Sequence, residues 1–307
     1  MSELQKYISK RIRILRTQSG MTQEQLEEKA DLGFAPDSSF PLTYAEKGLL
    51  QVKLHGPGWE DRPLQAGRAL NVVPDKATYK GQRLEELLPV IEQSGVNYTE
   101  EAGAVTVLGL SKHSKDAAEG VNAIVGLAES LSLIQPHPAL LFIADAVGED
   151  ATGAALFGEI KDEPSGALSF NIATLFIDKE RSEIGIDIRI PVLADKDALV
   201  ERLTEVAASY QLQYEEFDYL APLYVPLDSP LVSTLMKVYQ EETGDQTPAM
   251  SSGGATFART MENCVAYGAL FPGAEQTEHQ ANERAKLEDL YSALEIYAET
   301  IRRLATT

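Results

Sequence analysis

The stretch ATLFIDKERSEIGIDIRIPV, from Ala173 to Val192, decides how the centre of the chain folds. Two runs rich in β-branched and aliphatic residues, ATLFID and EIGIDIRIPV, are separated by the short polar segment Lys179 to Ser182. Such runs are typical of β-strands, and a short polar connection joins antiparallel neighbours. The sequence therefore predicts a β-hairpin here, and with it an antiparallel sheet at the centre of its domain.

Strands and helices alternate on both sides of this hairpin. The predicted strands are GLLQVKLHG (48–56) and GAVTVLGL (103–110). The predicted helices are LEELLPVIEQ (84–93), VNAIVGLAESLSLI (121–134) and DKDALVERLTEVAASY (195–210). Helices packed on one face of an antiparallel sheet make an α/β sandwich, which we predict for residues 49–225.

Two helices follow the sandwich. The first has Asp228 or Ser229 as its N-cap, Pro230 in its first turn and Gly244 as its stop. The last helix carries one apolar stripe, which predicts that it covers a core. The stripe consists of Leu287, Leu290, Leu294, Tyr297, Ile301 and Leu304.

The length of the chain predicts two domains, because 307 residues are many for a single core. The sandwich accounts for residues 49–225, so the flanking pieces, 1–48 and 226–307, must belong together. An inserted domain fits this order, since insertions are tolerated at surface loops.

Composition argues against several classes of protein. The chain has 27 basic and 47 acidic residues, and a net charge of -20 repels nucleic acids and anionic membranes. Its one cysteine, Cys264, excludes an internal disulfide framework and lies at the head of an apolar run, which predicts a packed thiol. No stretch approaches 18 apolar residues and the first 15 residues are too charged for a signal peptide, so we expect a cytoplasmic protein.

Two glycine- or proline-containing stretches could carry chemistry. GFAPDSSFP places Asp37 in a loop, and SSGGATFAR places Gly253 and Gly254 shortly before Arg259. Adjacent glycines allow an anion to approach the backbone, and a guanidinium binds a carboxylate through two parallel hydrogen bonds. The residues alone leave open a plain turn at Asp37 and a flexible loop with a surface arginine.

Three polar positions are less distinctive. His113 in LSKHSKDAAEGVNA lies between a strand and a helix, and Asn71 in LNVVPDKA precedes a proline that ends a strand. His279 in TEHQANE follows a buried run and has polar neighbours. A histidine in such a loop is often simply solvated, so none of the three is decisive by itself.

Together and in this order, these stretches resemble the PepV-like zinc dipeptidases of the aminoacylase and carnosinase metallopeptidase family. GFAPDSSFP, GGATFARTMENCVAYGALFPG and HQANE carry the resemblance, and IDIRIPV and GVNA support it more weakly. The resemblance implies an α/β fold in which residues 49–225 are an α+β lid of ferredoxin-like character. This lid is inserted into a zinc-peptidase catalytic domain, represented by residues 1–48 and 226–307.

The resemblance also implies roles for individual residues. Asp37 and His279 match ligands of the two metals in a two-zinc site, a pair that can generate hydroxide from water. His113 matches the lid histidine that polarises the scissile carbonyl. The positions that match substrate contacts are Arg259, Asn71, Gly253 and Gly254. The implied ligands are small dipeptides or other carboxylates.

The chain departs from the family pattern at its beginning. The family has a His-x-Asp pair, a bridging Asp and an acidic stretch, whereas here Gln18, Ser19 and Gly20 follow the predicted strand KRIRIL. One remaining ligand for each metal predicts weak or absent zinc, and loss of the general base predicts no hydrolysis by this chain alone. We therefore expect an N-terminally truncated dipeptidase: half of a split enzyme that needs a complementary N-terminal fragment, or a non-catalytic binding protein.

A helix-turn-helix DNA-binding protein is a remote alternative. RILRTQSGMTQEQLEEKADL resembles the first two helices of such a domain, with Thr22 and Gln25 as a capping box. However, Pro36 and Pro41 interrupt the segment where the recognition helix would lie. The acidic net charge is a second argument against DNA binding.

Overall fold

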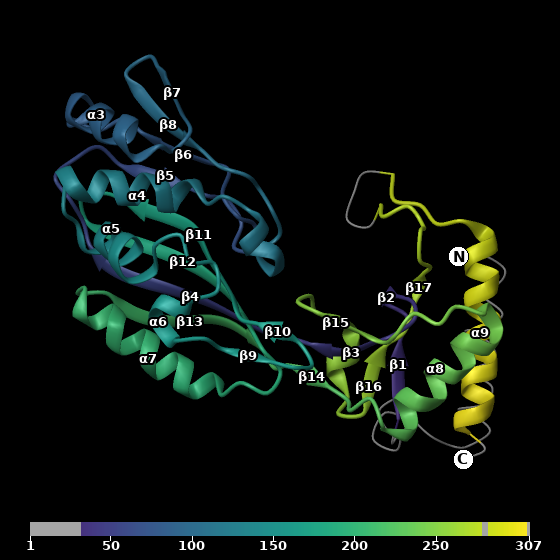
Figure 1. The fold of residues 1–307 in the computed structure, drawn as a ribbon. Helices are drawn as coiled ribbons and strands as arrows, with labels where there is room; N and C mark the ends of the chain where they lie inside the picture. The colour runs from purple at the N-terminus through teal and green to yellow at the C-terminus, as the bar shows by residue number, and fades with distance from the viewer. Residues whose placement is uncertain (1–31, 278–281, 306–307) are drawn as a thin grey trace.

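The computed structural model describes residues 32–277 and 282–305 and shows two lobes (Figure 1). The lobes are joined where β3 (Thr43–Glu46) continues into β4 (Gly48–Pro57), and again where β13 (Gln213–Leu220) is followed by β14 (Leu223–Tyr224). No helix in the described ranges is both long enough and apolar enough to span a membrane.

The large lobe is built on an antiparallel five-stranded sheet. Its strand order is β13-β4-β12-β11-β5, with β5 at Leu64–Ala66, β11 at Ser169–Ile177 and β12 at Arg181–Ile190. The pairing of Ile177 with Ser182 closes the β11–β12 hairpin. The predicted hairpin and the predicted antiparallel sheet are therefore confirmed.

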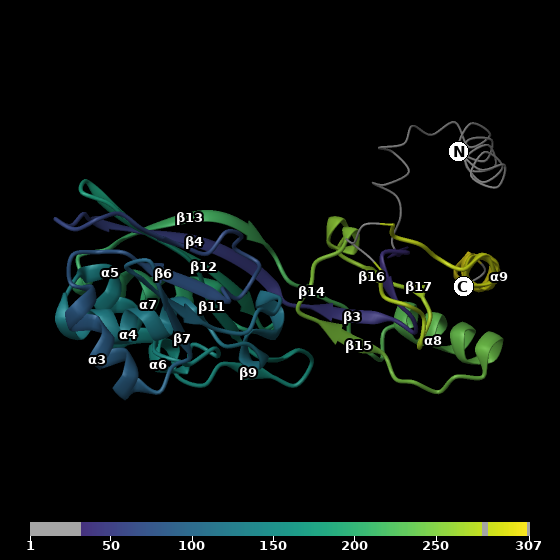
Figure 2. The same ribbon diagram turned by 90° about the horizontal axis from the view of Figure 1, so that it is seen from above.

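Helices cover one face of this sheet (Figure 2), and alternate residues of β4 point into the core beneath them, with Leu50, Val52 and Leu54 fully buried. The covering helices are α4 (Ala123–Ile134), α5 (Pro138–Leu141), α6 (Ala154–Phe157) and α7 (Lys196–Ser209), and a π-helix, η2 (Phe142–Val147), follows α5. The helices predicted at 121–134 and 195–210 are thus confirmed as α4 and α7.

A smaller sheet completes the large lobe. Its order is β6-β8-β7, with β6 at Lys76–Tyr79, β7 at Tyr98–Glu101 and β8 at Ala104–Leu108. The helix α3 (Leu84–Ser94) lies beside it and packs on α4. A 3₁₀ helix, η1 (Ser114–Glu119), lies between β8 and α4, and a short ribbon pairs β9 (Lys161–Asp162) with β10 (Gly166–Ala167).

The small lobe joins segments from both sides of the large one. Its main sheet has the order β1-β16-β3-β14, with β1 at Gly33–Ala35 and β16 at Cys264–Ala266, and β15 (Met250–Ser252) pairs parallel to β3. A second ribbon pairs β2 (Ser38–Ser39) with β17 (Ala269–Leu270). The other helical elements are η3 (Phe257–Thr260), α8 (Pro230–Thr243) and α9 (Leu287–Leu304).

An aromatic cluster around Phe40 forms the small-lobe core. The Phe40 ring lies 5.3 Å from Tyr239, 5.1 Å from Tyr267 and 4.6 Å from Phe271 between centroids. A Cβ at Gly268 would lie 2.4 Å from this ring, and its φ is +70°, so glycine is required there for both reasons. The strand-end backbone is thus held close against the cluster.

The caps of α8 are those predicted from the sequence, and α9 covers the small-lobe core with only part of its predicted stripe. The Ser229 side chain accepts a hydrogen bond from Val232 N, and Gly244 ends α8 in the left-handed conformation. On α9 the fully buried side chains are Ala293, Ile296 and Thr300. Of the predicted stripe, Tyr297 and Leu304 are partly buried and pack against the small-lobe core, whereas Leu287, Leu290 and Ile301 are exposed. The packing partners of α9, which include α8, determine the buried side.

The mixed α/β fold is confirmed, while several finer expectations stay predictions. These are the boundaries at 49–225, 1–48 and 226–307, the insertion and the ferredoxin-like character of the lid. The strand KRIRIL, Gln18 to Gly20 and the helix pair of the DNA-binding alternative lie outside the described residues. Where that alternative needs a recognition helix, the chain forms β1, β2 and β3 instead.

Candidate functional site

Asp37 lies in the loop between β1 and β2 and is exposed. Its Oδ2 accepts a hydrogen bond of 3.3 Å from Phe257 N, at the beginning of η3. This contact brings the GFAPDSSFP loop next to the SSGGATFAR segment, which is 220 residues further along the chain. The two stretches that the sequence singled out are therefore neighbours in the fold.

The two glycines of SSGGATFAR connect the lobes. The Gly253 carbonyl accepts a 3.0 Å hydrogen bond from Arg189 Nη1 of the large lobe, and Gly254 N donates to Ser252 Oγ at 2.9 Å. A Cβ at Gly253 would lie 2.7 Å from the Cβ of Lys115, which also belongs to the large lobe. Glycine is therefore needed because the two lobes approach closely at this point.

The guanidinium of Arg259 is used inside the protein. Its Nε donates to Glu46 Oε2 at 2.8 Å, and its terminal nitrogens donate to three backbone carbonyls. Four of the five N–H donors that a guanidinium has are thereby engaged. The Arg259 side chain is 9% exposed and that of Glu46 is 0% exposed. In this arrangement Arg259 does not present two parallel N–H groups to a ligand, and its predicted role stays a prediction.

Glu46 is a site residue that sequence reasoning missed. Its carboxylate accepts hydrogen bonds from Thr256 N at 3.0 Å, from Thr256 Oγ1 at 2.6 Å and from Arg259 Nε at 2.8 Å. It therefore holds the loop after Gly254 and the helix η3 against the end of β3. The one indication of this role in the sequence is that Glu46 is the charged residue at the end of the run LTYAE, directly before the connection between the lobes.

Asn71 and His113 lie side by side in the large lobe. An isolated antiparallel bridge pairs Val72 with His113, and the Asn71 carbonyl accepts a 2.9 Å hydrogen bond from Ser114 N. Both residues are exposed. The structure thus brings two of the predicted positions together on one surface, although their roles toward a substrate stay predictions.

The environment of His113 favours the neutral ring. Although the residue as a whole is exposed, partial desolvation of the imidazole lowers its pKa below the ordinary 6.5, and the nearby cations Arg189 and Lys115 lower the pKa further. The Nδ1 atom accepts a 3.1 Å hydrogen bond from Lys115 N. The proton of the neutral ring therefore sits on Nε2, which leaves Nε2–H as the available donor.

We expect an NMR titration of His113 to give a midpoint below pH 6.5 and the Nε2–H tautomer at neutral pH. Because the folded pKa is lower than that of the unfolded chain, the neutral ring is favourable above pH 6.5, and this contribution is lost as the pH falls through the folded pKa. Long-range ¹H–¹⁵N correlation spectra, assigned with His113→Gln, measure both quantities. A midpoint above 6.5, or an Nδ1–H signal, would contradict the arrangement.

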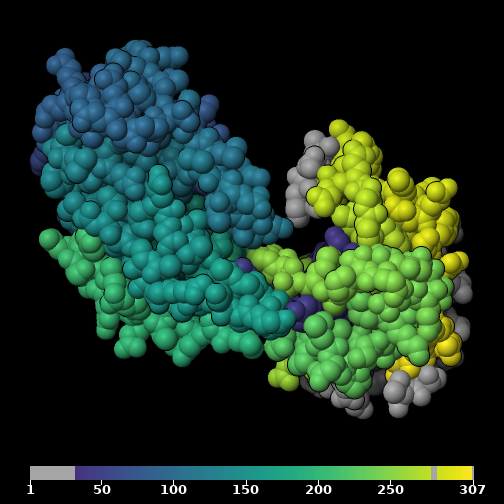
Figure 3. All heavy atoms as spheres, in the orientation of Figure 1, coloured from purple at the N-terminus to yellow at the C-terminus, as the bar shows by residue number. Residues whose placement is uncertain are grey.

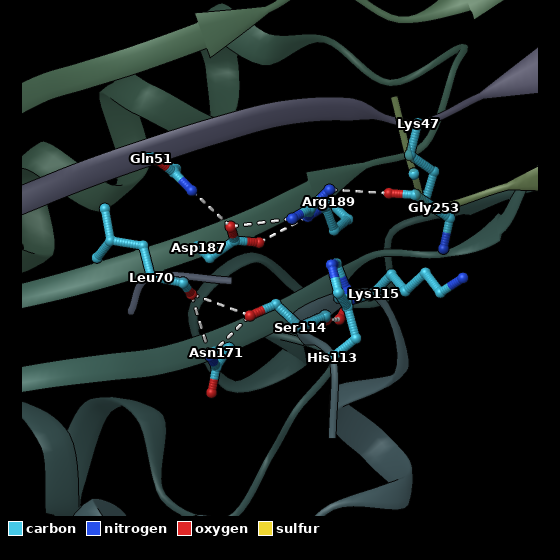
Figure 4. Close-up of polar contacts among 12 residues, drawn as sticks. Lys47, Gln51, Leu70, His113, Ser114, Lys115, Asn171, Asp187, Arg189 and Gly253 are labelled. Atoms are coloured by element: carbon cyan, nitrogen blue, oxygen red, sulfur yellow. Dashed lines mark hydrogen bonds and ion pairs between the residues drawn. The ribbon is translucent and has the colours of Figure 1, made fainter. Parts of the chain in front are cut away.

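A buried ion pair lies near His113 (Figure 4). Arg189 donates to both carboxylate oxygens of Asp187, at 2.6 and 3.1 Å, and Gln51 Nε2 donates to Asp187 Oδ2 at 2.9 Å. The side chains of Asp187 and Arg189 are 0% and 4% exposed. In the sequence IDIRI, the charged residues Asp187 and Arg189 alternate with isoleucines, so both charged side chains lie on the same side of the strand. This pattern does not reveal that the pair is buried.

A pocket of about 670 Å³ lies on the small lobe, where the two lobes face each other. Figure 3 shows the wide cleft between the lobes. The residues that line the pocket include Asp37, Ser252, Gly254 and Thr256 from the small lobe and Lys115 from the large lobe. Arg259 is not among the lining residues, because it lies behind the carbonyl of Gly254.

The described residues do not by themselves fit a two-zinc centre. Within 32–277 and 282–305, no three His, Cys, Asp or Glu side chains are grouped so that they could hold a metal ion. A protein zinc site needs three or four such donors. Asp37 is one carboxylate, and His279 lies outside the described residues, so the two predicted ligands cannot be joined into a site here.

Cys264 is the packed thiol that the sequence predicts. It is 4% exposed, and burial raises its pKa to about 11. A thiol that stays protonated at neutral pH is a poor nucleophile and a poor metal ligand. Cys264 therefore takes no part in the chemistry of the pocket.

Known proteins similar to this chain include two curated relatives. "Putative dipeptidase YtjP" of Bacillus subtilis (strain 168) is 33% identical over 303 residues, and "Putative dipeptidase MW1694" of Staphylococcus aureus (strain MW2) is 30% identical over 303 residues. Each alignment covers 91% of this chain and 65% of the relative. The chain thus spans about two thirds of the length of these relatives.

A solved structure and a family pattern also match. The crystal structure of aminoacylhistidine dipeptidase from Vibrio alginolyticus matches with a TM-score of 0.47 and 12% identity, over 88% of this chain and 65% of that one. The pattern of Peptidase family M20/M25/M40 matches residues 27–303. Because this match covers most of the chain, the chain belongs to the M20/M25/M40 peptidase family.

Proposed function

We propose that this chain binds short peptides, dipeptides above all, in the pocket between its lobes, as part of a dipeptidase-type hydrolase. The observation that carries the proposal is the composition of the pocket. It joins the loop of Asp37, the loop of Gly254 and Thr256, and Lys115 from the segment that also bears His113. These stretches are far apart in the sequence, and the loops of Asp37 and of Gly254 belong to the stretches that carry the resemblance to dipeptidases.

Within the family, the chain is proposed to be a PepV-like dipeptidase. Residues 49–225 would be an inserted lid of ferredoxin-like character, and residues 1–48 and 226–307 would be what this chain contributes to a catalytic domain. The neutral His113 suits a lid residue, because its Nε2–H can donate a hydrogen bond to a peptide carbonyl without carrying a charge. Asn71, whose carbonyl accepts a hydrogen bond from Ser114 N, is the second proposed lid contact, and neither it nor His113 is among the residues that line the pocket in this structure.

For the isolated chain, we propose that it binds short peptides without hydrolysing them. The described donors do not fit a zinc centre, so no step of the reaction is assigned to a metal here. Asp37 and His279 remain proposed ligands of a site that a complementary fragment would complete. A non-catalytic binding protein of the cytoplasm is the second candidate, and the same donor set favours it.

Binding of a dipeptide in preference to its C-terminal amide tests the proposal. We expect Leu-Leu to bind the 307-residue chain with a dissociation constant of about 1 mM, since an ion pair at an open site is screened by water. Leucyl-leucinamide should bind at least about threefold more weakly, because it lacks the carboxylate. The measurement is an NMR titration that follows the amide signals of Gly254, Thr256 and Lys115.

Two results would count against the proposal. The first is that no pocket signal moves up to the solubility limit of Leu-Leu. The second is that the largest shifts lie outside the pocket residues. As a matched control, glycerol at the same concentrations reports on nonspecific solvent effects at the same amides.

A further inference from the structure

A second pocket, of about 320 Å³, lies in the large lobe. Its walls include the first turn of α4, the end of α3, the end of η2 and parts of β8 and β11. It shares no lining residue with the pocket between the lobes. Pockets that hold small molecules have volumes of about 300 to 1,000 Å³, so this one is large enough for a ligand of its own.

Part of the pocket wall is apolar. Four aliphatic side chains from β8, α4, η2 and β11 line it, and each is at most 5% exposed: Val107, Val125, Val147 and Ile172. Apolar surface of this kind gains free energy when a hydrocarbon chain replaces water on it. The wall therefore favours a ligand with an aliphatic part.

The charged residues that line the pocket, Glu149 and Asp150, are both acidic. Asp150 is engaged within the protein, because its Oδ1 accepts a hydrogen bond from Thr152 N at 2.8 Å and its Oδ2 accepts one from Ala155 N at 2.9 Å. Glu149 is exposed, and within the described part of the chain its carboxylate has no hydrogen bond and no ion pair within 4 Å. Glu149 is thus the lining charge that remains available to a ligand.

A second carboxylate lies beside Glu149. Glu129 is one helical turn beyond Val125, on the same side of α4. A Cβ at Gly148 would lie 3.8 Å from Glu129 Oε1, so this carboxylate reaches the residue next to Glu149. Burial raises the pKa of Glu129, and the charge of Glu149 raises the pKa further. No lysine, arginine or histidine of residues 32–277 and 282–305 pairs with either carboxylate, so the two anions lack a cation.

The backbone that presents Glu149 has an uncommon conformation. The π-helix η2 is closed by a 2.8 Å hydrogen bond from Gly148 N to Ile143 O, and Gly148 ends it with a φ of +61°. Turns of a π-helix are rare and are frequent at functional sites. This turn places Glu149 in the pocket wall directly after the helix.

The first turn of α4 does not make the pocket a site for anions. Its N–H groups would suit an anion if they were unused. However, Ile124 N and Val125 N donate to Asn122 Oδ1, and Ala123 N donates to the Pro74 carbonyl. With these donors engaged and two carboxylates nearby, an anion would be repelled.

We propose that this pocket binds a small organic cation that consists of a primary ammonium group on a short aliphatic chain. The ammonium donates hydrogen bonds to the carboxylates of Glu149 and Glu129, and the chain packs on Val125 and Val147. A divalent metal ion fits less well, since it takes six or more oxygen ligands and no three His, Cys, Asp or Glu side chains of the described ranges are grouped to hold one. The site goes beyond the proposed function and does not depend on peptide binding.

An NMR titration of the 307-residue chain with n-butylammonium chloride, at neutral pH and constant ionic strength, tests the inference. The amide signals of Val125, Val147 and Glu149 should move and saturate with a dissociation constant of about 1 mM, because ion pairs at an open site are screened by water. The matched neutral compound, 1-butanol, should bind at least about threefold more weakly. Intermolecular NOEs from the butyl methyl group to the methyl groups of Val125 and Val147 should locate the chain.

Two single variants test the carboxylates. Glu149→Gln and Glu129→Gln should each weaken the binding of butylammonium by about three- to fivefold and leave the binding of 1-butanol unchanged. Glu60→Gln is the matched control, because it removes one negative charge from the same lobe. Glu60 pairs with Lys179 at 3.6 Å and does not line the pocket, so this variant should bind butylammonium as the wild-type chain does.

Four results would overturn the inference. Absence of shifts at the pocket residues would show that no cation binds there, and equal affinities for butylammonium and 1-butanol would remove the role of the carboxylates. Equal weakening in Glu60→Gln would mean that net charge alone attracts the ligand. Larger shifts of the same signals with calcium chloride would identify a metal ion instead.

The outcome is separate from that of the proposed function. The amides of Gly254 and Thr256, which report peptide binding, belong to the other pocket and should stay in place during titration with butylammonium. If the largest shifts occur at these two residues, the amine binds between the lobes and the inference is wrong. If Leu-Leu does not bind but butylammonium does, the proposed function fails while the inference stands.

Discussion

Replacing Glu46 with glutamine is expected to lower the free energy of unfolding of the small lobe by about 3–5 kcal/mol, the usual effect of removing one partner of a buried ion pair. The substitution leaves the Arg259 guanidinium without its anion, at a position where the arginine side chain is 9% exposed. It also turns one acceptor of the Thr256 and Arg259 hydrogen bonds into a donor. The loop at Gly254 should loosen together with the helix η3.

The two lobes can be followed separately in a urea titration. Trp59, the one tryptophan of the chain, is buried in the large-lobe core, whereas Tyr239 and Tyr267 are buried in the small-lobe core. Because Tyr79 is buried in the large-lobe core, the small lobe is followed through the ring NMR signals of Tyr239 and Tyr267, whose loss should shift to lower urea in Glu46→Gln, with a smaller shift of the Trp59 fluorescence.

Glu60→Gln provides the matched control for this substitution. Glu60 pairs with Lys179 at 3.6 Å, and the two side chains are 85% and 77% exposed, so no measurable change is expected. Equal stability of Glu46→Gln and the wild-type chain would show that Glu46 is not the anchor of Arg259.

The second prediction with a large expected effect concerns zinc binding and the hydrolysis of dipeptides. The 307-residue chain purified alone is expected to lose zinc on dialysis and to cleave Leu-Leu no faster than background. The described residues contain no group of three metal donors, and the positions that match the acidic stretch of the family carry Gln18, Ser19 and Gly20 in the sequence. General-base assistance alone is worth about a hundred- to ten-thousandfold in rate.

Metal analysis and a peptidase assay decide this prediction together. Near-stoichiometric zinc, with hydrolysis abolished by His279→Ala, would show that the chain completes its own site. Activity that appears only when an N-terminal segment of a full-length relative is supplied would instead identify half of a split dipeptidase. Asp37→Asn then serves as a variant of the other proposed ligand, and it should abolish the restored activity.

Local features of the fold could be predicted from the sequence because their causes are local. The β11–β12 hairpin follows from two apolar runs joined by a short polar turn. The helix α8 follows from Ser229, Pro230 and Gly244, each of which acts on the backbone within one turn. The buried side of α9 could not be predicted in the same way, because Ile296 and Thr300 are buried by elements distant in the sequence.

The sequence by itself determined the family, the mixed α/β fold and the stretches that meet at the pocket, because short motifs and periodicity depend on neighbouring residues. Only the tertiary structure decided how the charges at the site are used. Arg259 meets Glu46 across 213 positions of the chain, and Lys115 meets Gly253 from the other lobe. Whether a cation is buried in an ion pair or faces a pocket depends on such distant contacts, since burial and pairing, rather than residue type, determine which charge remains available to a ligand.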